Sequence, residues 1–299
     1  RIHWHMRDVH RLAERTLLLV WVRPMTAFSD YRSPAWSCRT RMATRDLSNR
    51  PSCNGAWHRG WRLDRWLSMR PLRKWRGVPF VRRAPTRSGE DVPLHVSEMT
   101  MAHVLWWHSH VQPIIDRDPE RADNGWNWLL YVPFAEVAGR VLTRNPVGYT
   151  VGISDPAQDR FVPCALVQLL GRVPALDDHD RESAFVWFLS TAPDEALTTI
   201  EDHPIPADRV PRRLGSIALD VAVTHSLNQR RLGRTALYAD ERGGDALLQW
   251  YRRRGMTVLP DEEKLPRGPR RLLKPSDGRY CYYTVRAAME ASKELDPLR

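Results

Sequence analysis

The sequence predicts an α/β fold in which one mixed sheet carries helices on both faces. Three consecutive runs rich in apolar residues, separated by turn-forming residues, read as adjacent strands at 148–153, 161–173 and 183–191. Two helical segments precede these runs, and helices alternate with strands after them. With 299 residues, the chain is long enough for one such domain and an additional segment.

The segments before the three strands follow from apolar spacing and helix-ending residues. They are a short strand at 94–96, a helix at 97–116, an acidic loop at 116–124 and a helix at 127–144. Asn145 and Pro146 end the second helix, because a residue before proline disfavours helical backbone. The third strand is continuously apolar from Ala184 to Leu189, which is typical of a central strand.

The C-terminal part alternates between helices and strands. We expect a linker at 194–211, a helix at 213–229, a strand at 234–239, a turn and amphipathic helix at 240–254, a strand at 256–259, paired strands at 270–274 and 279–285, and a helix at 286–295. The pairing is predicted from the turn Pro275-Ser276-Asp277-Gly278.

The net charge of +11 is unevenly distributed. Residues 1–88 hold 20 Lys and Arg against 5 Asp and Glu, whereas residues 89–299 hold 26 against 30. We therefore expect a basic segment at 1–88 and a separate domain at 89–299. Nucleic-acid binding, which basic surfaces favour, is expected only through residues 1–88.

Two interpretations of the first third stay open. It contains seven of the 13 Trp, a single Lys (Lys74) and no lasting apolar period. Residues 1–68 have the composition expected when a GC-rich gene is translated from upstream of its start. On this interpretation they are non-native or disordered, and Met69 is a candidate start. Alternatively they form a basic arm, since interleaved Arg and Trp can stack on bases or bind a membrane surface.

Several function classes are disfavoured. The four cysteines lack metal-binding or redox spacing, and neither His103, His108 and His110 nor the run 177–180 makes a convincing ligand set, so we expect no metal. The apolar run 16–22 is too short to span a bilayer, and no clean signal peptide precedes it. We therefore expect a cytoplasmic protein without a membrane partner.

Two segments carry the functional prediction. The first is the start of a helix, with the sequence Arg212-Arg213-Leu214-Gly215-Ser216. Free backbone amides, the helix dipole and two arginines there favour the binding of a diphosphate. The second is Trp250-Tyr251-Arg252-Arg253-Arg254-Gly255-Met256, which follows the strand at 235–240 and ends the amphipathic helix.

Together these segments and the element order resemble the GNAT superfamily of acyl-CoA-dependent N-acyltransferases, over residues 89–299. The resemblance implies a mainly antiparallel sheet flanked by helices, with the acyl-CoA pyrophosphate at Arg212, Arg213, Leu214, Gly215 and Ser216. The family pattern fits in two registers, and we prefer the one in which Gly215 is the last small residue and Arg213 replaces an earlier glycine. Met256 departs from the family's usual Phe.

The resemblance also implies individual roles. Tyr251 matches the tyrosine that protonates the departing thiolate, which suits a phenol at neutral pH. Backbone groups of Leu189 and Ser190 would pair with the pantetheine amides, as in an added strand. The family often has Asn where this chain has Gly244, so that coenzyme contact is either lost or supplied by Asp245.

The implied activity is transfer of an acetyl or other acyl group from acyl-CoA to a primary amine, by direct attack in a ternary complex. Small molecules, peptide N-termini and aminoacyl-tRNA remain open as acceptors, and the oligomeric state is not fixed. Glu182 and Asp240 are candidates for the general base, although each has the context of a solvated carboxylate. The alternatives are a non-catalytic acyl-CoA-binding protein and a nucleic-acid-binding protein that uses the first third.

Overall fold

The computed structural model describes residues 81–141, 145–155, 160–200, 204–263, 265 and 276–299. These residues form an eight-stranded sheet with the order β1-β2-β3-β4-β5-β6-β8-β7. Its strands are β1 Val81–Pro85, β2 Asp91–Glu98, β3 Pro146–Asp155, β4 Arg160–Pro174, β5 Glu182–Thr191, β6 Thr235–Tyr238, β7 Thr257–Val258 and β8 Tyr280–Tyr283.

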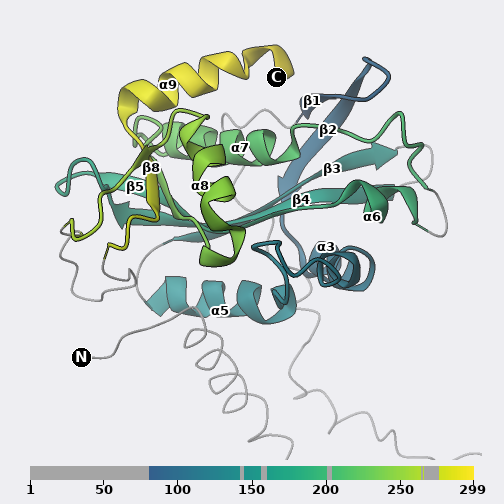
Figure 1. The fold of residues 1–299 in the computed structure, drawn as a ribbon, viewed down its shortest axis with the longest axis horizontal. Coiled ribbons are helices and arrows are strands. Elements are labelled where there is room, and N and C mark those ends of the chain that lie inside the picture. Colours follow the sequence, from purple (N-terminus) through teal and green to yellow (C-terminus); the bar gives the residue numbers. More distant parts are fainter. Residues whose placement is uncertain (1–80, 142–144, 156–159, 201–203, 264, 266–275) are drawn as a thin grey trace, which may run out of the picture.

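Helices cover both faces of the sheet, as the sequence predicts (Figure 1). α7 and α9 lie on one face, and α3 and α5 lie on the other. The helices are α3 Met101–His110, α4 Gln112–Ile115, α5 Trp128–Val141, α6 Asp194–Thr198, α7 Leu214–Asn228, α8 Gly244–Arg252 and α9 Val285–Glu294, with short 3-10 turns η1 Glu241–Gly243 and η2 Asp296–Leu298.

The sheet is mixed and mainly antiparallel, which confirms the predicted fold class. From β1 to β5 each strand pairs antiparallel with the next, and β6 and β7 pair antiparallel with β8. The pair β5–β6 alone is parallel within the described part of the chain. From β2 onward the main helices and strands follow the order that the sequence predicts, and β1 and α6 are additional.

The sheet begins upstream of residue 89, where the sequence placed the domain boundary. Val81 to Pro85 forms β1 and pairs with β2. Exposed and buried positions alternate along β1, and one of the buried side chains is Arg82. An arginine at a core position hides the apolar alternation by which a strand is recognised, so the sequence pattern missed this strand.

Three smaller differences concern local breaks. The helix expected at 97–116 is divided at Val111 into α3 and α4, with Pro113 in the first turn of α4. The linker expected at 194–211 contains α6. The expected strand at 270–274 lies outside the described residues, and the strand expected at 279–285 forms β8 between β6 and β7. In the described part of the chain, no helix combines the length and apolarity needed to cross a membrane.

Candidate functional site

The parallel strands β5 and β6 are paired over only three residues. Ala184, Phe185 and Val186 pair with β6, and β5 then continues to Thr191 without a described strand on that side. The backbone groups of 187–191 that face away from β4 therefore form an edge without a strand partner among the described residues, where the Thr191 carbonyl accepts a hydrogen bond from Arg121. We call the space beside this edge the β5–β6 gap. An unpaired strand edge can accept an extended ligand that carries amide groups.

A β-bulge lies at the start of the gap. Phe188 pairs with Gln168 of β4, whereas Val186 pairs with Leu169, so Trp187 is the extra residue in β5. A bulged residue is left outside the ladder, and the bulge bends its strand. The bulge therefore coincides with the place where β5 leaves β6.

Tyr251, the predicted proton donor, lies on α8 and is 8% exposed. Among the described residues, no group forms a hydrogen bond with its hydroxyl. Burial, followed by the neighbouring Cys281 and Asp123, raises the pKa of Tyr251 above its ordinary value. The phenol is therefore protonated at neutral pH and able to donate.

The start of α7 has the features of an anion site. Arg213 precedes the helix with a left-handed backbone (φ 62°) and provides no side-chain cap. The amides of the first turn have no acceptor among the described residues, so they remain available to a ligand. Glycine is favoured in this backbone conformation, as the register that aligns Arg213 with a family glycine expects.

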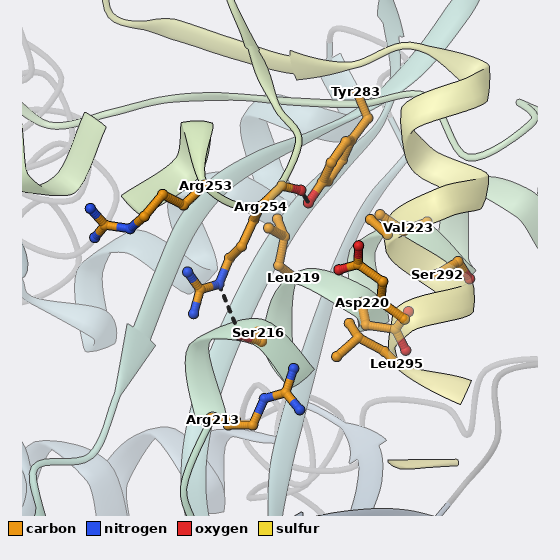
Figure 2. Close-up of a pocket in the computed structure, with 12 residues that line it drawn as sticks. Arg213, Ser216, Leu219, Asp220, Val223, Arg253, Arg254, Tyr283, Ser292 and Leu295 are labelled. Carbon is orange, nitrogen blue, oxygen red and sulfur yellow. Dashed lines mark hydrogen bonds between the residues drawn. The ribbon is translucent and has the colours of Figure 1, made fainter. Parts of the chain in front are cut away.

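A cleft adjoins this helix start, between α7 and α9 (Figure 2). Arg254, just after α8, donates from Nε to Ser216 Oγ over 2.9 Å. Its guanidinium lies 3.7 Å from the centre of the Trp250 ring. A Cβ added at Gly215 would come within 3.1 Å of that same ring, so the helix start and Trp250 are in close contact.

Gly244 begins α8 with φ 56° and ψ −159°. This region of backbone space is essentially restricted to glycine, so a side chain such as that of Asn would strain the backbone here. The Gly244 carbonyl accepts a hydrogen bond from Arg279 at 3.0 Å. A contact between Gly244 and a ligand would therefore involve backbone atoms only.

The two carboxylates that the sequence suggests as general bases, Glu182 and Asp240, both form ion pairs with arginines. Glu182 begins β5 and forms ion pairs with Arg172 (2.8 Å) and Arg231 (3.4 Å). The three paired residues of β5 separate it from the gap. Asp240 follows β6, caps η1 and pairs with Arg242 at 3.2 Å.

A third carboxylate, which the sequence reasoning did not single out, lies at the gap. Asp123 belongs to the loop before α5, is 5% exposed, and accepts a hydrogen bond from Ser190 Oγ of β5. Arg121 binds the same carboxylate through two nitrogens at 2.8 Å and also donates to the Thr191 carbonyl. In the sequence, the indication of Asp123 as a site residue was the acidic loop at 116–124. Only the fold shows that a carboxylate of this loop contacts β5.

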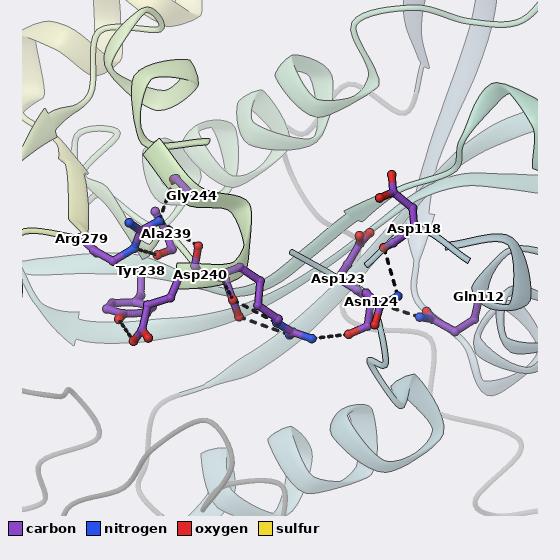
Figure 3. A network of polar contacts seen from close by, with 11 residues as sticks. Gln112, Asp118, Asp123, Asn124, Tyr238, Ala239, Asp240, Gly244 and Arg279 are labelled. Carbon is purple, nitrogen blue, oxygen red and sulfur yellow. Dashed lines mark hydrogen bonds and ion pairs between the residues drawn. The ribbon is translucent and has the colours of Figure 1, made fainter. Parts of the chain in front are cut away.

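The same loop also reaches the β6 side of the gap. Figure 3 shows polar contacts extending from Arg279 and Asp240 to Asn124 and Gln112. Arg242, held by Asp240, donates to the Asn124 carbonyl. Residues 121–124 thus connect the ends of the two diverging strands.

No metal centre is evident in the part of the chain that the structure describes. Groups of three or more His, Cys, Asp or Glu side chains do not come together there. His103, one of the histidines considered as a ligand, instead contacts the Thr150 hydroxyl at 3.1 Å.

No protein-family model matches the chain, and no curated protein matches it. Among solved structures, a GNAT-family acetyltransferase from Staphylococcus aureus Mu50 is 10% identical, with 64% of this chain and 99% of that one covered and a TM-score of 0.40. Spermidine N-acetyltransferase from Vibrio cholerae, solved with CoA and spermine, is 12% identical, with 66% and 98% covered and a TM-score of 0.38. An acetyltransferase from Salmonella typhimurium that modifies the N-terminal serine of ribosomal protein L7/L12 is 12% identical, with 64% and 94% covered and a TM-score of 0.39.

Proposed function

We propose that this protein transfers an acyl group from acyl-CoA to a primary amine. The observation that carries the proposal is the β5–β6 gap, an open strand edge beside Asp123, whose charge also acts on the buried proton donor Tyr251. The start of α7, which is suited to an anion, comes after β5 in the chain. A single extended ligand that carries a thioester and a diphosphate would therefore suit both the strand edge of β5 and the start of α7.

The donor would bind along β5. Its pantetheine amides would pair with the backbone of Leu189, which faces away from β4, and not with that of Ser190, which pairs with Leu166 of β4. The diphosphate would contact the amides of Leu214, Gly215 and Ser216 and the side chains of Arg212 and Arg213. Gly244 would contribute only backbone atoms.

The reaction requires one attack and two proton transfers. The neutral amine attacks the thioester carbonyl to form a C–N bond, and the tetrahedral intermediate then collapses with cleavage of the C–S bond. Tyr251 would give its proton to the departing sulfur, and the proton lost from the nitrogen would return to solvent or to the phenolate. Amide and free CoA are the products.

The acceptor would approach from the face that carries α3 and α5. Asp123 is the buried carboxylate on this side of the gap, and its charge contributes to raising the pKa of Tyr251. Its pairing with Arg121 makes it a poor base for an ammonium group. We therefore assign Asp123 a positioning role, in which it orients the acceptor-side loop against β5. The acceptor class is an amine on a small molecule or a peptide.

Acetyl-CoA is expected to stabilise the protein, by about 2.7 kcal/mol at a concentration 100 times the Kd. Arg213→Gly should weaken this binding roughly 10-fold or more, since it removes a charged donor to phosphate. It should not lower the stability of the free protein, because glycine tolerates the left-handed backbone. Calorimetry and thermal unfolding measure both effects.

Arg230→Gly is the matched control. Arg230 also has a left-handed backbone (φ 60°) but lies after the C-terminal end of α7. This variant should retain the full thermal shift with acetyl-CoA. Failure of millimolar acetyl-CoA to stabilise the unmodified protein would count against acyl-CoA as the donor.

Asp123→Asn is expected to lower kcat/KM for the amine by about 10-fold, through the loss of a charge-assisted contact within the site. The amide keeps the size of the side chain and an oxygen for Ser190, so the affinity for CoA should change little. Steady-state kinetics with varied amine, together with CoA calorimetry, separates the two effects. Asp118→Asn, in the same loop, is the control, because Asp118 is exposed and its side chain caps only the backbone of Glu120. Equal losses in both variants would refute a specific role for Asp123.

A further inference from the structure

The cleft between α7 and α9 changes character along its length. At the start of α7 it is lined by Arg213 and Ser216, and by Arg254 from the segment after α8. Further along α7 the lining is mixed: Leu219, Val223 and Leu295 lie beside Asp220, Ser292 and Glu294. Figure 2 shows Arg254 extending toward Ser216, with Arg213 on the other side of the same helix turn and Arg253 directed outward.

The arginines of this cleft have no acidic partner. In the described parts of the chain, none of Arg213, Arg253 and Arg254 pairs with a carboxylate. The cleft does contain Asp220, but that side chain is already bound by Arg82 (3.3 Å) and Arg299 (2.6 Å). Glu294, from α9, also lines the cleft. The basic end therefore carries positive charge that an anion would neutralise.

Arg254 is held in one orientation before any ligand binds. Its guanidinium stacks on Trp250, and its Nε and Nη1 donate to Ser216 Oγ and to the Trp250 carbonyl. Burial, with a contribution from the charges of Arg213 and Arg253, lowers the pKa of Arg254 from its ordinary value. Nη2 has no acceptor among the described residues. A fixed guanidinium loses little conformational entropy when it binds a phosphate.

We propose that Arg254, which is held beside Ser216, binds a phosphate group separate from the diphosphate at the amides of α7. This inference rests on the proposed function and extends it. In acyl-CoA the separate phosphate is the one on the ribose 3′ oxygen. The protein therefore distinguishes coenzyme A from coenzyme A that lacks the 3′-phosphate.

The test compares CoA and dephospho-CoA by calorimetry on the full chain. Dephospho-CoA is expected to bind about 10-fold more weakly or worse, as for the loss of one charge-assisted phosphate contact. Arg254→Gln should lower the affinity for CoA to that for dephospho-CoA, with little effect on dephospho-CoA itself. Arg252→Gln removes the same charge from α8 at a residue that does not line the cleft, and should keep the full difference.

The ratio of the two affinities is read within each variant, so a change in stability affects both ligands alike. Arg254→Lys accompanies the glutamine variant because it keeps the charge, and it should retain part of the discrimination. Equal binding of CoA and dephospho-CoA by the unmodified protein would overturn the inference and leave the proposed function standing. Unchanged discrimination in Arg254→Gln would overturn the assignment to Arg254. If neither compound binds, the proposed function itself fails.

Discussion

Tyr251→Phe is expected to lower turnover by about 100-fold or more, the usual size of general acid assistance. Phenylalanine keeps the ring that packs in the core and removes only the hydroxyl. Because no described group binds that hydroxyl, its loss leaves no protein donor or acceptor unpaired. Folding and CoA affinity should therefore change little. The measurement is release of free thiol from acetyl-CoA with a panel of amines and peptides.

A second buried tyrosine provides the control. Tyr149 on β3 contacts His225 Nδ1 at 3.0 Å, away from the β5–β6 gap. Tyr149→Phe should reduce stability, because it removes a buried hydrogen bond, and should leave turnover unchanged. The opposite pattern, with full turnover in Tyr251→Phe, would remove Tyr251 from the mechanism. A protein that binds acetyl-CoA but acylates no amine would instead support the non-catalytic alternative.

Arg82→Ala is expected to lower the free energy of unfolding by about 3 kcal/mol, the lower end of the cost of breaking a buried ion pair. Arg82 is 1% exposed and pairs with Asp220 of α7, so it joins the edge strand β1 to the helix that carries the anion site. Arg299 remains beside Asp220 in this variant and limits the loss. Urea unfolding measures the change.

The neighbouring Arg83 is exposed, and Arg83→Ala should have almost no effect. The double variant Arg82→Ala with Asp220→Ala should lose less than the sum of the single losses, since each single variant already removes the shared pair. Equal effects of Arg82→Ala and Arg83→Ala would show that the pair does not hold β1 in place. A chain that begins at residue 89 lacks β1 altogether and should be less stable than one that begins upstream of Val81.

The sequence by itself determined the elements whose signals are local. Apolar spacing located α5, α7 and β3 to β5 to within a few residues, because helices and strands repeat their buried positions at fixed intervals. The charge pattern placed a domain boundary near residue 89, but β1 lies upstream of it at Val81–Pro85. The segments around Gly215 and Tyr251 suggested a donor site because their chemistry lies within a few consecutive residues.

The tertiary structure alone decided how these elements form a site. The β5–β6 gap depends on which residues of two distant strands pair, and the bulge at Trp187 depends on its register with β4. Asp123 reaches Ser190 across 67 positions of sequence, and Arg82 reaches Asp220 across a longer interval. Neither contact has a local pattern, because a side chain's partner is fixed by the packing of whole elements and not by its neighbours in the chain.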